Sequence, residues 1–183
     1  MRTRISRVTF FVLVALALVS SGCLISGTFV VVEEVDFDFT ADTGFYWYPV
    51  DLTGNSVWED HADDIDNIDA LGMQFQITNT SDVETRFRVS FAKSSVPIVD
   101  AVAPDEIPSN AVVVIDGLTV AAGATRNIGY AGSLAYIGNI EKFKEIIMSG
   151  RFDYYGESTG GTDDYAFEVR DGKIVVTISA SST

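Results

Sequence analysis

The sequence contains very few cysteines, histidines and cationic residues. It contains one cysteine and one histidine in 183 residues, Cys23 and His61. One cysteine cannot form an internal disulfide, so the disulfide-stapled class is excluded. Cationic side chains are also scarce, because 12 Lys and Arg stand against 26 Asp and Glu and give a formal net charge of −14. Nucleic-acid phosphates need a positively charged face, so this balance argues against nucleic acid as a partner.

Motifs of nucleophilic, zinc or nucleotide chemistry are also missing. No G-x-S-x-G, H-E-x-x-H or P-loop pattern occurs in the sequence. His61 stands in an acidic segment with no nucleophile motif beside it, and a catalytic triad needs a base and an orienting group at fixed geometry. With 26 acidic residues some carboxylate pair is inevitable, so a pair alone does not indicate a glycosidase. We therefore expect a protein that is not an enzyme.

The first 22 residues have the three-part pattern of an export signal. Three arginines within residues 1–7 precede a 12-residue apolar run, 8–19, and small residues occupy 20–22 immediately before Cys23. The apolar run is too short to span a hydrocarbon core of ~30 Å, which takes about 20 residues. Removal of residues 1–22 leaves 161 residues with 9 cationic and 26 acidic side chains, a net charge of −17.

The segment Ser20-Ser21-Gly22-Cys23, following a hydrophobic run, resembles the lipobox of bacterial lipoprotein precursors. The resemblance implies diacylation of the Cys23 thiol, cleavage before it, and an exported domain held at a membrane by lipid. The residue that follows Cys23 is Leu24 and not Asp, which resembles the outer-membrane sorting pattern of some Gram-negative lipoproteins. We therefore expect the protein at the outer membrane or cell surface and not in the cytoplasm. The family prefers Leu where this chain has Ser20. Two alternatives stay open: conventional cleavage that releases a secreted protein, and an uncleaved anchor formed by the uncharged residues 8–32.

The mature chain alternates apolar and polar residues in short runs separated by turns. This pattern predicts one antiparallel β-sandwich over residues 28–183, immunoglobulin-like in the broad sense, with one or two short helices, behind a linker at 23–27. A chain of this length buries about two thirds of its unfolded surface. The predicted strands cover residues 29–39, 73–78, 87–91, 111–115, 117–120, 125–130, 151–155, 165–170 and 173–179.

Two turn signals predict hairpins between successive strands. Asn79-Thr80-Ser81-Asp82 separates the runs at 73–78 and 87–91, which we expect to pair as an antiparallel hairpin. Asp171-Gly172 separates the last two runs and is a strong signal for a two-residue hairpin loop. Residues 94–110 contain three prolines and form either a long crossing connection or an edge segment.

Two segments have helical features. Asn139 can cap a helix from Ile140 to Met148 that ends at Gly150 and packs across the sandwich as a lid. Apolar residues also recur at helical spacing from Ser56 to Leu71. Because Asp is a poor helix former in helix interiors, a short helix or a turn-rich loop is an equally supported alternative for that segment.

Four aspartates in the densest acidic segment are candidate ligands for Ca²⁺. Hard cations bind several carboxylate and carbonyl oxygens, and Asp60, Asp63, Asp64 and Asp66 could supply them. The segment has no EF-hand loop pattern. A solvated acidic face is the alternative, and an acidic surface also suits a protein that stays soluble in high salt, where screening removes self-repulsion.

Aromatic residues fill positions 45–48 and are followed by Pro49, with Trp58 nearby. In a strand, Phe45 and Trp47 point to one face and Tyr46 and Tyr48 to the other. Aromatic faces stack on sugar rings or bury against a partner, so we take Tyr46, Tyr48 and Trp58 as candidate ligand contacts. Packing in the core is the alternative.

These observations predict an exported, lipid-anchored module with a binding, adhesion or assembly role and an unidentified protein or glycan partner. The alternative function is a cation-dependent carbohydrate-binding or glycan-hydrolysing domain. In that alternative, the aromatic residues and the acidic segment would share one cleft.

Overall fold

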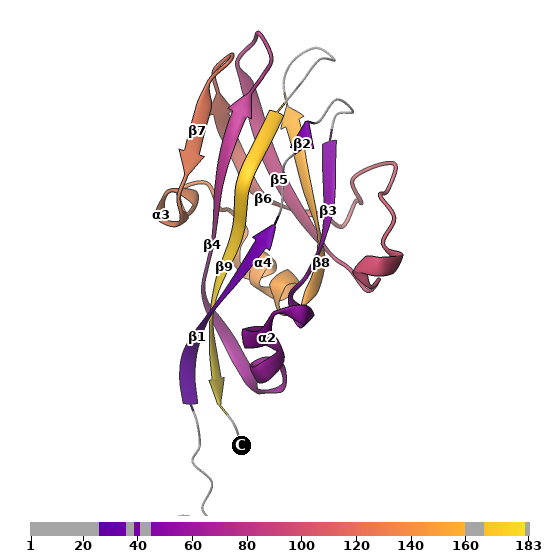
Figure 1. The fold of residues 1–183 in the computed structure, drawn as a ribbon, viewed down its shortest axis with the longest axis vertical. Coiled ribbons are helices and arrows are strands. Elements are labelled where there is room, and N and C mark those ends of the chain that lie inside the picture. Colours follow the sequence, from indigo (N-terminus) through magenta and orange to yellow (C-terminus); the bar gives the residue numbers. More distant parts are fainter. Residues whose placement is uncertain (1–25, 36–38, 41–44, 160–166, 182–183) are drawn as a thin grey trace, which may run out of the picture.

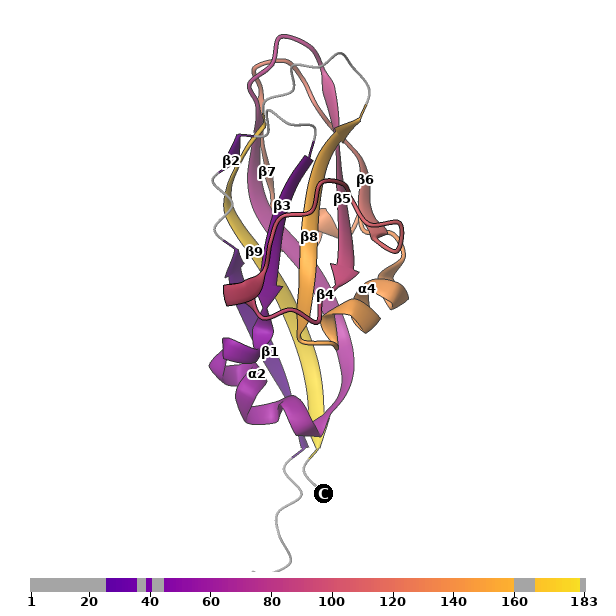
Figure 2. The same ribbon diagram turned by 90° about the vertical axis from the view of Figure 1, so that its right-hand side faces the viewer.

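A computed structural model describes residues 26–35, 39–40, 45–159 and 167–181. The leader, Cys23, and the ends of the predicted strands at 29–39 and 165–170 lie wholly or partly outside these residues. The described chain is mainly β and forms two antiparallel sheets, which confirms the predicted β-sandwich class (Figures 1 and 2).

The first sheet has the strand order β1-β9-β4-β7, with the short β2 also paired with β9. The second sheet has the order β3-β8-β5-β6. The strands of the first sheet are β1 (Ser26–Val35), β2 (Phe39–Thr40), β4 (Ile65–Asn79), β7 (Thr125–Ile128) and β9 (Phe167–Ser181). Those of the second are β3 (Phe45–Asp51), β5 (Thr85–Lys93), β6 (Val112–Val120) and β8 (Arg151–Thr159).

The core lies between the sheets and is filled by every second residue of the strands. In β9, Ile174, Val176 and Ile178 point inward as predicted and are fully buried. Aromatic residues fill much of the second sheet's inner face, where Phe91 packs edge-to-face against Phe152 and Tyr154.

The predicted hairpin between residues 73–78 and 87–91 is wrong. The first run lies in β4 and the second in β5, and these strands belong to different sheets. Both runs still bury one face, because β4 contributes to the core from one side and β5 from the other. Alternation shows that one face is buried but not whether the next strand lies beside it or opposite it.

The predicted hairpin at Asp171-Gly172 is also wrong, because β9 continues through these residues. Gln74 pairs with Lys173 and Gln76 with Arg170, so one β4 residue faces two β9 residues, and the pair forms a β-bulge. Asp171 has a φ of 53°, in the left-handed region. The Asp171-Gly172 pair, which predicted a turn, therefore forms a β-bulge within a long strand.

The helix predicted after Asn139 is confirmed as α4 (Ile140–Ile147). Asn139 occupies the N-cap position with a left-handed φ of 50°, but its side chain donates to the Val113 carbonyl instead of capping the helix. Gly150 ends the turn that follows, with a φ of +73°, and its N–H donates to the Ile147 carbonyl. The helix packs against β4, β5, β6 and β8, as the expected lid does (Figure 2).

The segment Ser56–Leu71 is helical only in its first part. Helix α2 (Ser56–His61) is capped by the Asn55 side chain, which accepts from the Val57 N–H. A 3-10 turn, η2 (Ala62–Asp64), follows, and β4 begins at Ile65. Pairing with β9 overrides the helical spacing from Ile65 onward, because these residues join the ladder and bury their apolar side chains there.

Residues 94–111 connect β5 to β6, which are neighbours in the second sheet. The segment passes over the outer face of that sheet and includes a 3-10 turn, η3 (Ile98–Asp100), which contacts β3 (Figure 2). Tyr155, Ser90 and Ala92 lie on the outward side of their strands and are nevertheless buried. The remaining short elements are η1 (Leu52–Gly54) and α3 (Tyr130–Ser133).

Candidate binding site

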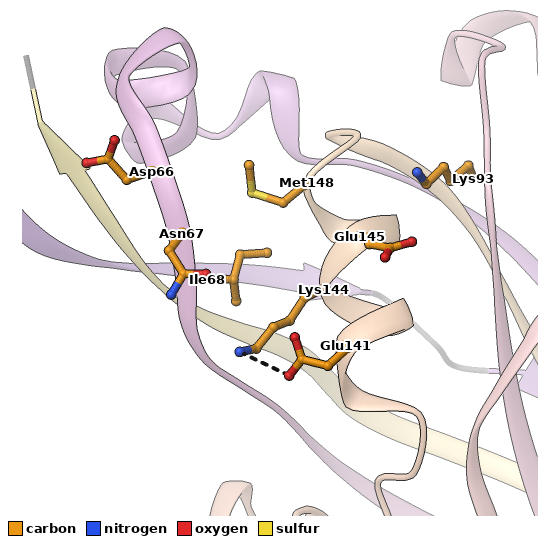
Figure 3. A pocket seen from close by; sticks show the side chains of 8 residues that line it. All are labelled: Asp66, Asn67, Ile68, Lys93, Glu141, Lys144, Glu145 and Met148. Carbon is orange, nitrogen blue, oxygen red and sulfur yellow. Dashed lines mark ion pairs between the residues drawn. The ribbon is translucent and has the colours of Figure 1, made fainter.

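A groove lies between the first part of β4 and helix α4 (Figure 3). Its volume is about 420 Å³. Strand β4 supplies one wall, α4 and the residue after it supply the other, and the last residue of β5 closes one end. The lining residues are Asp66, Asn67, Ile68, Lys93, Glu141, Lys144, Glu145 and Met148.

The amphipathic pattern of α4 determines which of its side chains face the groove. Phe143, Ile146 and Ile147 are buried in the core. The Phe143 ring stacks on Phe91 with ring centroids 4.4 Å apart, which fixes the helix against β5. The polar side of the helix and Met148, which is 41% exposed, remain available to a ligand.

The groove carries charges of both signs. Lys144 Nζ lies 3.6 Å from Glu141 Oε1, and the lysine side chain is mostly covered whereas the glutamate is exposed. In the described part of the chain no carboxylate forms an ion pair with Lys93 or with Lys142. Both of these lysines line a second hollow of about 200 Å³ on the other side of α4.

Three of the four lysines of this strongly acidic chain therefore lie in or beside α4. Lys142 and Lys144 belong to the helix, and Lys93 is the last residue of β5. Ammonium groups donate hydrogen bonds to carboxylates or carbonyls, while Glu145 and Asp66 accept them from a ligand's donors. Met148 adds exposed apolar surface between the charged groups, and the buried Ile68 lies beneath it (Figure 3). Such an arrangement can bind an extended peptide, whose backbone carries both donors and acceptors and whose side chains carry either charge.

The structure disperses the four aspartates that sequence reasoning proposed for Ca²⁺. Asp60 and Asp63 are exposed on α2 and η2, Asp64 is half-buried, and Asp66 lies on β4 in the groove. Asp66 accepts a hydrogen bond from the Ser181 hydroxyl at 2.6 Å. Across the described residues there is no group of three or more His, Cys, Asp or Glu side chains that could hold a metal ion.

The candidate aromatic residues do not line the groove. Tyr46 and Tyr48 are half-buried and pack against the core, where Tyr46 meets Tyr154 edge-on at 6.4 Å. Trp58 is 4% exposed. Their positions agree with the core-packing alternative, and the structure does not bring them into one cleft with the four aspartates.

The opposite face of β3 holds a partly buried polar contact. Trp47 Nε1 donates to Asp153 Oδ1 at 3.0 Å. Burial raises the pKa of Asp153, and the hydrogen bond from Trp47 opposes that rise.

His61 stacks on Phe29 with ring centroids 3.7 Å apart, so the histidine covers an apolar residue of β1.

Sequence reasoning missed Lys93, Lys144 and Met148 as site residues. One signal was available, since lysines are scarce in this chain and three of the four fall at positions 93, 142 and 144. Their approach to Asp66 and Ile68 depends on packing between distant segments, which spacing along the chain does not reveal.

No protein-family model matches this chain. No curated protein matches it either.

Proposed function

We propose that the chain is an exported lipoprotein, tethered to a membrane through Cys23, and that its sandwich is a non-enzymatic module that binds a protein segment in the groove beside α4. The mixed-charge groove, with Lys93 outside any ion pair in the described residues, carries the binding part of the proposal. The lipobox-like segment at residues 20–23 carries the tether.

The position of β1 supports the tether. This strand begins at Ser26, three residues beyond Cys23, and an extended segment of that length reaches about 10 Å. Ser26 pairs with Ser181, so the start of β1 and the end of β9 lie at the same pole of the sandwich (Figures 1 and 2). A lipid on Cys23 would hold that pole close to the membrane.

The same pole is acidic, because α2 and η2 lie there with exposed Glu59, Asp60 and Asp63 (Figure 2). Anionic lipid headgroups repel such a surface, so adsorption by charge does not hold the domain at a membrane. A covalent lipid supplies attachment of a different kind, about 0.8 kcal/mol for each buried CH₂. The described residues contain no helix with the length and hydropathy needed to cross a membrane.

Mass spectrometry of the membrane fraction from the source organism tests the tether. We expect a chain that begins at Cys23 and carries acyl mass, and we expect Cys23→Ser to block this processing. Ser21→Ala is a control that keeps a small residue before the cleavage site and is processed normally. An unmodified full-length precursor in membranes, or a chain released without lipid, overturns the tether.

Crosslinking in native membranes followed by pull-down tests the groove. We expect a discrete protein adduct that is lost when Lys93→Glu and Met148→Asp are combined, because the pair reverses one charge and polarises the apolar surface. Arg170→Glu reverses a charge on β9 that lies far along the first sheet from the groove, because Arg170 pairs with Gln76, eight residues beyond Ile68 on β4, and it is expected to leave the adduct intact. An adduct that survives the groove substitutions refutes the groove, and the lack of any adduct refutes a protein-binding role.

A further inference from the structure

A third hollow, of about 280 Å³, lies on the outer face of the first sheet beside β4 and β7. Figure 1 shows these two strands next to each other. We call this hollow the amide pocket, because three of its lining side chains are the carboxamides of Gln74, Gln76 and Asn127. Asp171, at the β-bulge of β9, is its acidic member. The β4–β7 ladder fixes two of the amides, since Gln76 and Asn127 are directly paired.

The amides leave donors and acceptors unused. Gln76 Nε2 donates to Asn127 Oδ1 at 2.9 Å, which leaves the Gln76 carbonyl oxygen and the Asn127 amino group available. Neighbouring residues therefore offer one acceptor and one donor side by side. In the described part of the protein Gln74 makes no side-chain hydrogen bond, and its amide is exposed. Two adjacent hydroxyl groups, each both donor and acceptor, complement this arrangement.

The charges around the pocket favour a neutral ligand. Among the described residues, no Lys or Arg lines it. The two cations next to it in the strand register, Lys173 and Arg170, are held in ion pairs with Glu34 at 2.6 Å and Glu168 at 3.2 Å. An anionic ligand would meet the Asp171 carboxylate without a free cation to offset the repulsion, whereas a hydroxyl group can donate to that carboxylate.

An aromatic ring lies beside the pocket. Gly72 is on the same face of β4 as Gln74, about 7 Å away along the strand. The Tyr130 ring rests on Gly72 so closely that a Cβ there would lie 2.5 Å from Tyr130 Cε2. Tyr130 is half-buried and directly follows Gly129, which lines the pocket, so the ring lies at the pocket's border and not within its lining. Rings of this kind offer flat apolar area to the C–H face of a sugar.

We infer that the amide pocket is a carbohydrate-binding site for a neutral sugar, in which Gln74, Gln76, Asn127 and Asp171 bond to vicinal hydroxyls and Tyr130 packs against the ring. No metal takes part in this recognition, because every proposed contact is a direct hydrogen bond or an aromatic contact. The site lies on the first sheet and is independent of the groove beside α4 and of the lipid tether.

Titration of the full-length protein with neutral oligosaccharides tests the inference. The probes are maltotriose, cellotriose, mannotriose and triacetylchitotriose, and the protein is kept in a detergent without a sugar headgroup. Two-dimensional NMR follows the side-chain amide signals of Gln74, Gln76 and Asn127. We expect saturable shifts of these signals with at least one probe and no dependence on added chelator.

Variants locate the site. Gln74→Ala and Tyr130→Ala are each expected to lower the affinity about tenfold, the factor that loss of one good polar or aromatic contact brings. Asn110→Ala removes an exposed amide elsewhere and is expected to change nothing. The inference is overturned if no probe shifts the amide signals, if Asn110→Ala weakens binding as much as Gln74→Ala, or if inorganic phosphate displaces the sugar. Each of these outcomes leaves the tether and the α4 groove untouched.

Discussion

Asn79 is the buried polar residue whose removal should damage this fold most. It is 0% exposed, and its amide nitrogen donates to the carbonyls of Val120 at 3.0 Å and Val83 at 2.7 Å. Its amide oxygen accepts from the N–H of Ser81 at 3.0 Å and from the Ser81 hydroxyl at 2.7 Å. One side chain therefore ties the end of β4 to the turn after it and to the end of β6 in the opposite sheet.

Asn79→Ala removes four hydrogen bonds. A net contribution of about 1 kcal/mol for each bond predicts a loss of about 4 kcal/mol in the free energy of unfolding. That is a large part of the 5–15 kcal/mol typical of a domain, as a rough guide. For a chain of this size it lowers the melting temperature by about 10 °C.

Urea unfolding followed by circular dichroism measures this loss. Asn127→Ala is the matched control, because it removes an exposed amide with one hydrogen bond and should change stability by less than about 0.5 kcal/mol. If Asn79→Ala costs less than about 1 kcal/mol, or no more than the control, the idea that this side chain holds the crossing between the sheets is refuted.

Three further predictions use the same unfolding assay. Gly150→Ala should lower the free energy of unfolding by about 1–2 kcal/mol, because φ is +73° and the new Cβ would lie 3.1 Å from Thr53 Cγ2. The control Gly54→Ala places its Cβ in open space and should change stability by less than about 0.5 kcal/mol. Equal effects of the two variants would refute the strain argument. Phe91→Ala should cost about 3–5 kcal/mol by leaving a cavity beneath α4, and a loss below about 1 kcal/mol would contradict the packing described. Burial raises the pKa of Glu33, against an opposing hydrogen bond from Asn55, so its contribution to stability is present below the ordinary carboxyl pKa and is lost as the pH rises through the raised value. Glu33→Gln should therefore gain stability over the native chain at neutral pH and lose that advantage in acid, and a constant difference across pH would count against it.

Local signals in the sequence were read correctly where a short segment decides the structure. The positions of Asn139 and Gly150 predicted where α4 begins and ends, although the Asn139 side chain donates to the Val113 carbonyl and does not cap the helix. Alternation in residues 173–179 predicted which side chains of β9 face the core. The turn at residues 79–82 was also predicted, but it connects strands of two different sheets and not the two strands of a hairpin.

The errors share one physical cause, which is competition from distant partners. Asp171-Gly172 has the local preference of a hairpin turn, but β1 and β4 pair with β9 on both sides and stabilise a continuous strand with a bulge. Residues 65–71 have helical spacing, but the ladder with β9 offers backbone hydrogen bonds and burial that a helix with acidic interior positions does not.

The sequence by itself determined the net charge of −17 for residues 23–183, the β class and the buried face of most strands, because each of these depends on composition or on neighbours along the chain. The export-type leader stays a prediction from the same kind of local pattern. The tertiary structure decided which sheet each strand joins, and thereby where the groove beside α4 and the amide pocket form. Lys93, Lys144 and Asp66 meet at one groove, and Gln74, Asn127 and Asp171 at another, through contacts between segments far apart in the chain. Period-two patterning places a side chain on a face, and only packing of the two sheets decides what lies opposite.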